Sequence, residues 1–431
     1  MTQNGLTVGI NEKPKSIGSW IILSLQHVFA MFGATVLVPM LTGLDVGVAL
    51  VASGIGTLIY ILCTKGKVPV YLGSSFAYIT TISAAIVATG SASAAYLGLM
   101  VVGIIYVIIA LIIFFVGSGW LKKLLPPVVI GPMIIIIGLT LAPVAVTNFG
   151  LLGMQPLYDN GLYIGLEGAA WKVPLVAFIT FATVVILTTK AKGFLKIVPF
   201  IIAILVGYIF SVIFGVVNLV ETFKNVSFFQ VPNFSIIGTY DFNFSQVLVF
   251  APLAFVTIAE HIGDHVVLGE ITGNDFIENP GLHRTLLGDG IATFVSASLG
   301  GPANTTYGEN TGVIALTKVG SVFVIGLAAI FAILLGFLGY IQAFIMSIPW
   351  AVIGGMTIIL YGLIAANGVK VLIKDKTDLS KMKNLIIVST MLVIGLGGAF
   401  INITPSTTLK EMSLAAIVGI VLNQILTALE K

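Results

Sequence analysis

Runs of about twenty apolar residues recur from one end of this 431-residue chain to the other, and no other feature restricts its fold so strongly. A transmembrane helix needs about 20 such residues. Only 9% of the residues are charged, against roughly 25% in soluble domains, so the chain lacks the charged surface that solubility requires. The runs are continuous rather than alternating, which argues against a membrane β-barrel. The sequence therefore predicts an all-α, polytopic integral membrane protein.

Hydropathy predicts fourteen spans. Three are shorter segments, near 69–90, 287–300 and 302–317, which small, polar and proline residues interrupt. The first and third of these, spans 3 and 10, begin with β-formers or proline, and we expect extended backbone there. The eleven long helices are predicted at 19–41, 46–64, 94–116, 126–146, 172–190, 197–216, 246–269, 320–340, 347–367, 384–402 and 412–429.

Lysine and arginine test this count, because they gather in the cytoplasmic loops of membrane proteins. With both termini cytoplasmic, fourteen spans leave Lys172, Lys224 and Lys410 outside and the other seventeen of the 20 basic residues inside. We therefore expect a multi-pass protein of the plasma (inner) membrane with both ends in the cytoplasm. No basic cluster suggests nucleic acid as a partner. The single cysteine, Cys63, excludes a disulfide framework.

Two short strings recur half a chain apart. VIGPM at 129–133 returns as VIGGM at 352–356, and the pattern of SSFAY at 74–78 returns as TTYGE at 305–309. Each match taken alone is compatible with chance. Together they relate span 5 to span 12 and span 3 to span 10, so the chain is predicted to contain two repeats of seven spans. Seven is odd, so the second repeat is inverted, and inverted repeats with interrupted spans are typical of secondary transporters.

The interrupted segments themselves suit a binding site. In both, a strand-like stretch is followed by serine or threonine and then by a helical run. Extended backbone at membrane depth is tolerated where protein covers it or where it lines a cavity. Two half-helices would then direct their N-terminal N–H groups at a common point, which favours acceptor atoms such as carbonyl oxygens.

Three acids lie inside apolar spans: Glu260, Asp264 and Glu309. A carboxylate in mid-membrane costs at least ~2.5–3.5 kcal/mol, and no lysine or arginine lies at the same depth. Glu260 and Asp264 share one helix face and repel each other, which favours the protonated form of one of them and suggests a proton carrier. The alternative is a structural role as protonated, hydrogen-bonded groups. Asp289 and Glu270, near predicted helix ends, are expected to face water.

The same helix carries His261 and His265, four residues apart. Histidines at this spacing can bind zinc, so an intramembrane metalloprotease is an alternative reading. No third ligand motif is present, and the repeat favours transport. We expect at least one of these histidines to pack or hydrogen-bond. The pair Gln26–His27 in span 1 is expected to bridge helices.

Several strings carry a resemblance to a known family. ENTGVIALTK at 309–318, Gln26-His27 in span 1 and Glu260 in span 8 match the signature positions of the nucleobase–ascorbate transporter family. SLQHVFAMFGATVLVP, YLGSSFAYI, AEHIG and NTTYGENTGV are similar to its uracil-carrying bacterial members. The similarity runs from about residue 10 to residue 430. It implies a transporter rather than an enzyme, without a cofactor, that imports uracil by proton symport through alternating access, and it implies a homodimer in the lipid bilayer.

The resemblance also implies two moving domains. The core domain would comprise residues 1–125 (spans 1–4) and 246–345 (spans 8–11). The gate domain would comprise residues 126–245 (spans 5–7) and 346–431 (spans 12–14). Antiparallel strands in spans 3 and 10 would meet at the substrate site.

Carried over by position, Glu260 and Glu309 would accept hydrogen bonds from the pyrimidine N–H groups. The backbone N–H groups of Phe76 and Gly308 would donate to its carbonyl oxygens. The remaining pocket residues would be Ala34, Ser75, Tyr307 and, from the gate side, Tyr361. Glutamate at 309, where purine and ascorbate carriers commonly have glutamine, favours a pyrimidine.

One position departs from the family pattern. Some uracil carriers have histidine four residues after the span-8 glutamate, where this chain has Asp264 and then His265. Proton coupling would then involve Glu260 with Asp264 or His265. The cargo could instead be xanthine or another nucleobase. An anion channel or carrier is an alternative from a different functional class, and it would need a basic residue where this chain has Glu309.

Overall fold

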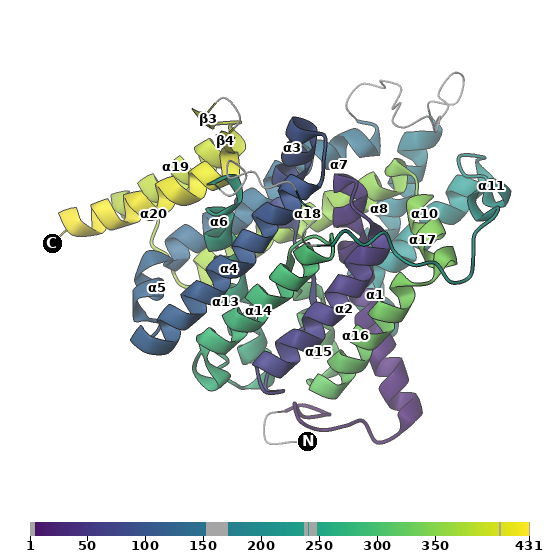
Figure 1. Cartoon of the computed structure of the whole chain (residues 1–431), viewed down its shortest axis with the longest axis horizontal. Coiled ribbons are helices and arrows are strands. Elements are labelled where there is room, and N and C mark those ends of the chain that lie inside the picture. Colours follow the sequence, from purple (N-terminus) through teal and green to yellow (C-terminus); the bar gives the residue numbers. More distant parts are fainter. Residues whose placement is uncertain (1–4, 152–170, 237–239, 241–247, 405–406, 431) are drawn as a thin grey trace.

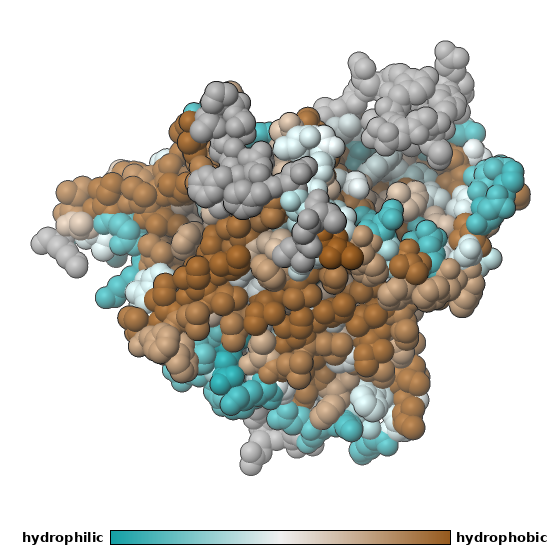
Figure 2. All heavy atoms as spheres, viewed as in Figure 1, coloured by the Kyte–Doolittle hydropathy of each residue, from teal (hydrophilic) through white to brown (hydrophobic). Residues whose placement is uncertain are grey.

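The fold is seen in a computed structural model that describes residues 5–151, 171–236, 240, 248–404 and 407–430 (Figure 1). The chain is mostly helical. Seven of the described helices are long and apolar enough to cross a membrane, and four shorter apolar helices accompany them. Brown, hydrophobic residues form a broad band across the middle of the view, with teal residues along its lower edge (Figure 2). This surface is the one expected for a protein immersed in lipid.

The first half of the chain forms helices and one short strand. Its elements are α1 (Ile17–Thr42), α2 (Val46–Cys63), β1 (Leu72–Ser74), the 3₁₀ turn η1 (Phe76–Tyr78), α3 (Ile79–Thr89), α4 (Ser93–Val116), α5 (Gly119–Leu124), α6 (Pro127–Thr140), α7 (Ala142–Phe149), α8 (Lys172–Lys190), α9 (Phe194–Ile197), α10 (Pro199–Ile213) and α11 (Leu219–Phe223).

The second half has the same character and adds a hairpin near its end. Its elements are α13 (Leu253–Thr272), the π turn η2 (Ile277–Gly281), α14 (Leu282–Ser298), β2 (Asn304–Thr306), α15 (Gly308–Thr317), α16 (Val322–Gly336), α17 (Gly339–Met346), α18 (Trp350–Lys374), α19 (Met382–Leu396), β3 (Phe400–Thr404), β4 (Thr407–Lys410) and α20 (Glu411–Leu429).

Two groups of helices pack most extensively. In one, α2 packs against α14 and α16, and α14 packs against α4; these helices lie side by side in the middle of Figure 1. In the other, α18 packs against α6 and α8, and α19 packs against α6 and α20. Helix α13 touches members of both groups, and α1 packs against α16 of the first group and against α10, which packs on α8 of the second. Both helices therefore lie where the two groups meet.

The predicted strands of the interrupted spans are confirmed. Strands β1 and β2 pair antiparallel, with Leu72 opposite Thr306, Gly73 opposite Thr305 and Ser74 opposite Asn304. All six residues are buried, so protein covers this extended backbone, as the absence of water in a membrane requires. A helix follows each strand within a few residues. The number of membrane crossings and the inverted relation of the halves stay predictions.

One helix boundary differs from the expected one and changes the surroundings of an acid. The sequence predicts a span from 287, with Asp289 at its watery end, but α14 begins at Leu282. Asp289 therefore lies two turns into the helix and has no exposed surface. The expectation for Asp289 was wrong, because the polar string before it reads as a loop. Glu270 is exposed, as expected, and it forms an ion pair with Lys374.

The contact between α4 and α14 is close enough to be tested by a single methyl group. A Cβ added at Gly103 would lie 2.7 Å from the carbonyl oxygen of Gly290 and 2.8 Å from the backbone nitrogen of Phe294. Backbone atoms of a packed helix cannot rotate away, so Gly103→Ala should destabilise the protein by about 1–3 kcal/mol. Thermal unfolding in detergent measures this. Gly18→Ala, on a helix with nothing within 4 Å of the added Cβ, is the control and should leave stability unchanged or raise it.

Candidate functional site

The strand pair joins two half-helices at one place in the molecule. Beyond the ladder itself, the backbone N–H of Tyr307 donates to the carbonyl of Tyr71 at 3.1 Å, and that of Ser75 donates to the carbonyl of Ala303 at 2.9 Å. These bonds extend the pairing to Ser75 and Tyr307, the residues directly before each helical segment. The N-termini of η1 and α15 are therefore held on either side of the same pair of strands.

These two N-termini carry backbone donors that are not used within their own helices. The first N–H groups of a helix have no partner within the helix, and they carry partial positive charge. Phe76 opens η1 and Gly308 opens α15. Gly308 is exposed although its neighbour Tyr307 is buried, and a Cβ added to Gly308 would meet no atom within 4 Å. The start of α15 thus faces open space, where a ligand oxygen can reach its N–H groups.

The structure brings the three membrane acids together at this space. Glu260 and Asp264 lie on one face of α13, and Glu309 lies in the first turn of α15. All three are half-buried. The hydroxyl of Thr306 in β2 donates to Oδ2 of Asp264 at 2.5 Å, and Glu260 is near enough to Asp264 and Glu309 to feel the repulsion of both charges.

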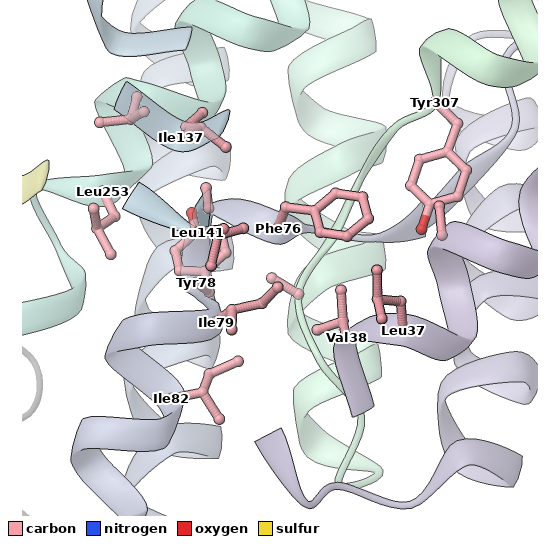
Figure 3. Close-up of a cluster of buried hydrophobic side chains, with 14 of the residues drawn as sticks. Leu37, Val38, Phe76, Tyr78, Ile79, Ile82, Ile137, Leu141, Leu253 and Tyr307 are labelled. Carbon is pink, nitrogen blue, oxygen red and sulfur yellow. The ribbon is translucent and has the colours of Figure 1, made fainter. Parts of the chain in front are cut away.

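Aromatic rings border the same region. The ring of Phe76 meets the ring of Tyr361, on α18, edge to face with centroids 6.2 Å apart. Phe76 and Tyr307 both lie in the buried apolar cluster around the strand pair (Figure 3). The hydroxyl of Tyr361 is buried without a hydrogen-bond partner among the described residues, as is that of Ser75. Each is a polar group available to a ligand.

Helix α1 supports the site from a third side. The hydroxyl of Tyr307 donates to the carbonyl of Ser74 at 2.9 Å and accepts from the hydroxyl of Thr35 at 3.2 Å. The hydroxyl of Ser74 donates to the carbonyl of Thr35 at 3.0 Å. Ala34, the neighbour of Thr35, is buried on the same turn of α1. These bonds fix both strands to the turn of α1 that carries Ala34.

For His27 of the pair Gln26–His27, the expected role of bridging helices is confirmed, and its partner lies in α15. The side-chain amide nitrogen of Asn310, in α15, lies 3.1 Å from Nδ1 of His27 and donates to the His27 carbonyl at 3.0 Å. Both residues are buried. This contact holds α15 against α1 one residue beyond Glu309.

The histidines of α13 face away from Thr306. Nδ1 of His261 lies 2.8 Å from Oδ2 of Asp289 on α14, and His265 bonds to the hydroxyl of Tyr60 on α2 and to the carbonyl of His261. Sequence reasoning missed the partnership with Asp289. The string EHIGDH contained a signal, because its two acids lie four residues apart and its two histidines also lie four residues apart. On a helix this spacing places the acids on one face and the histidines on another.

Comparisons with known proteins agree with this picture. Residues 18–404 match the sequence model of a permease family. The uracil permease of Bacillus subtilis (strain 168) is 47% identical over 431 residues, which cover 99% of this chain and 96% of that protein. The uracil permease of Escherichia coli (strain K12) is 41% identical over 423 residues, covering 97% and 93%.

Solved structures share the fold at low identity. The transmembrane domain of the cyanobacterial bicarbonate transporter BicA has a TM-score of 0.65 at 16% identity, covering 94% of this chain and 98% of that one. The murine anion transporter Slc26a9 in its inward-facing state has a TM-score of 0.68 at 12% identity, covering 97% and 69%. At such identities the likeness concerns the fold and not the cargo.

Proposed function

Because the chain belongs to the permease family of nucleobase–ascorbate transporters, an integral membrane family of transporters and not of enzymes, we propose that it imports uracil by proton symport through alternating access. The names of its relatives suggest the cargo, and the chemistry of the site supports it. Uracil is neutral and planar and alternates N–H and C=O groups around its ring. It therefore needs acceptors and donors arranged in turn.

The observation that carries this proposal is the meeting of acids with helix N-termini. Glu260 and Glu309 supply acceptors for the two N–H groups, and the backbone N–H groups of Phe76 and Gly308 supply donors for the two carbonyls. Hydrogen bonds to charged groups contribute about 1.5–3 kcal/mol each. An anionic cargo is disfavoured, because Glu309 stands where it would need a cation.

Proton coupling is supported by the same acids. Glu260, Asp264 and Glu309 lie close together, and the described residues form no ion pair between them and a lysine or arginine. Three carboxylates in a membrane without a cation cost much free energy, and binding a proton to one or more of them lowers that cost. Glu260 and Asp264 are the carriers we assign. The bonds of His265 to Tyr60 and to the helix backbone fit a supporting role in the coupling.

We place the moving boundary between the two groups of helices. The predicted core (1–125 and 246–345) contains the group built on α2, α4, α14 and α16, and the predicted gate (126–245 and 346–431) contains the group built on α6, α8, α18 and α19. Packing of α2 on α16 mirrors that of α4 on α14, which supports the inverted repeat. Phe76 on the core and Tyr361 on the gate meet across this boundary.

One part of the predicted gate travels with the core in this proposal. The backbone N–H of Asn233 donates to Oδ2 of Asp45, the N-cap of α2, and Gln230 and Ser235 donate backbone bonds to Phe337 and Leu299. Residues 227–236 are therefore tied to core helices. The linker after α10, near 214–226, is where the chain would bend.

The predicted orientation gains support from contacts between element ends. Arg284, at the start of α14, donates to the carbonyl of Cys63 at the end of α2, and Lys374 at the end of α18 pairs with Glu270 at the end of α13. These ends carry basic residues assigned to the cytoplasm, and they meet on one side. We propose that both termini lie on that side.

Uptake of radiolabelled uracil into proteoliposomes tests the function. With an acidic exterior we expect accumulation that a protonophore collapses and that sodium does not replace. Accumulation that follows a sodium gradient instead would overturn proton coupling and leave the cargo intact. Competition by unlabelled bases tests the cargo, and inhibition by xanthine stronger than that by uracil would overturn the choice of a pyrimidine.

A further inference from the structure

Helix α13 has a second polar face, turned away from the proposed site. Its residues are His261 and His265, and they meet Asp289 of α14 and Tyr60 of α2. His261 and Asp289 are fully buried, with Nδ1 of the imidazole 2.8 Å from Oδ2 of the carboxyl group. The rings of the two histidines stack with centroids 4.0 Å apart. None of these four residues is needed to contact uracil.

Hydrogen-bond chemistry separates the two histidines. Nδ1 of His265 lies 2.6 Å from the carbonyl oxygen of His261, which only accepts, so Nδ1 carries a hydrogen. In a neutral ring Nε2 then accepts, and the hydroxyl of Tyr60 is its donor. Both nitrogens of His265 are thereby used. Among the described residues, neither Nε2 of His261 nor Oδ1 of Asp289 has a hydrogen-bond partner.

A charge argument gives the His261–Asp289 pair a proton. A buried carboxylate without a cation costs several kcal/mol, whereas a carboxyl group and an imidazole that share one proton are neutral together. Within the described part of the chain, the only ion-pair partner of Asp289 is His261. The titratable groups that face it are Tyr60 and Cys63 from α2, Tyr78 from η1, Tyr106 from α4, and Glu260, Asp264 and His265 from α13.

We propose that His261 and Asp289 form a second proton-binding site behind the substrate site, linked to the protonation of Glu260 and Asp264; this rests on the proposed proton symport. The link is electrostatic, because His261, which bonds to Asp289, directly follows Glu260 on α13 and lies three residues before Asp264. When Glu260 or Asp264 is protonated, less negative charge lies near the His261–Asp289 pair, and the pair releases its proton more easily. When that acid loses its proton, the added negative charge makes the pair bind its proton more tightly.

The test is Asp289→Asn in proteoliposomes. Asparagine keeps the shape and a neutral charge but exchanges no proton. We expect uracil affinity and uracil–uracil exchange within about twofold of wild type, while accumulation driven by a pH gradient falls by about fivefold or more, a typical coupling strength. His261→Gln removes the site from the other helix and should give the same division. Thr257→Val is the control, because Thr257 is a buried, non-titrating residue of α13 that bonds to Tyr78.

Wild-type accumulation by both site variants would overturn the proposal. If neither folds, Asp289 is observed directly in Asp264→Asn protein whose aspartates carry ¹³C carboxyl groups. Uracil binding should then shift a labelled infrared band, either that of a protonated carboxyl group or that of a carboxylate, and labelled bands that do not change overturn the proposal. Failure of the wild-type protein to accumulate uracil under a pH gradient would count instead against the proposed function.

Discussion

Glu260→Gln is expected to abolish the accumulation of uracil under a pH gradient. Glutamine keeps the length of the side chain and one acceptor oxygen, but it cannot take up a proton. Glu260 lies beside Asp264 and Glu309, with no ion pair to a lysine or arginine in the described chain, so its proton is the means by which the cluster changes charge. A carrier that binds uracil without exchanging the proton still trades uracil for uracil and performs no work.

The measurement compares gradient-driven uptake with exchange in the same vesicles. Uptake should fall by at least about tenfold, and affinity should weaken by ~1.5–3 kcal/mol from the lost charged acceptor. Glu270→Gln is the matched control, because Glu270 is an exposed acid of the same helix whose surface ion pair contributes ~0–1 kcal/mol. Undiminished accumulation by Glu260→Gln would remove Glu260 from the coupling mechanism.

Gly73→Ala is expected to damage the site without touching a charge. The added Cβ would lie 2.4 Å from the ring of Tyr307 and 2.7 Å from the hydroxyl of Thr35. Tyr307 cannot swing aside cheaply, since its hydroxyl bonds to Ser74 and Thr35. Overpacking costs about 1–3 kcal/mol, and each bond lost adds ~1 kcal/mol.

Binding of uracil and thermal stability should therefore both decrease for Gly73→Ala, the affinity by about tenfold or more. Gly326→Ala serves for comparison, because the Cβ added there meets its nearest neighbour at an ordinary 3.7 Å. If Gly73→Ala bound uracil as the wild type does, the strand pair would have to be more adaptable than its hydrogen bonds indicate.

Much of the fold could be predicted from hydropathy, because unpaired backbone groups and charged side chains both cost free energy inside a membrane. Extended backbone at 69–75 and 302–306 was expected from the residue types, and its pairing as β1 and β2 from the family resemblance. Glu260, Asp264 and Glu309 were recognised because no lysine or arginine lies at the same depth. Their meeting at one place needed the three-dimensional structure, since α13 and α15 are separated by α14.

The prediction for Asp289 was wrong because a polar residue can lie either in an exposed loop or buried against a partner on another helix. The string before Asp289 reads as a loop, yet its residues begin α14, and the acid is buried against His261. Hydropathy counts a polar residue as exposed, and it does not identify a partner on another helix. The β3–β4 hairpin also went unpredicted, because the span predicted at 384–402 runs through Gly397 and Gly398 into the apolar start of β3.

The pairing of β1 with β2 has a consequence for the folding of the protein during its synthesis. More than half of the 431 residues lie between Gly73 and Thr305, so the ribosome completes β1 long before its partner exists. In the meantime the backbone of β1 lacks its ladder at a depth where water cannot replace it. A chain that stops short of Asn304 therefore leaves the backbone groups of β1 without the partners that the complete protein supplies.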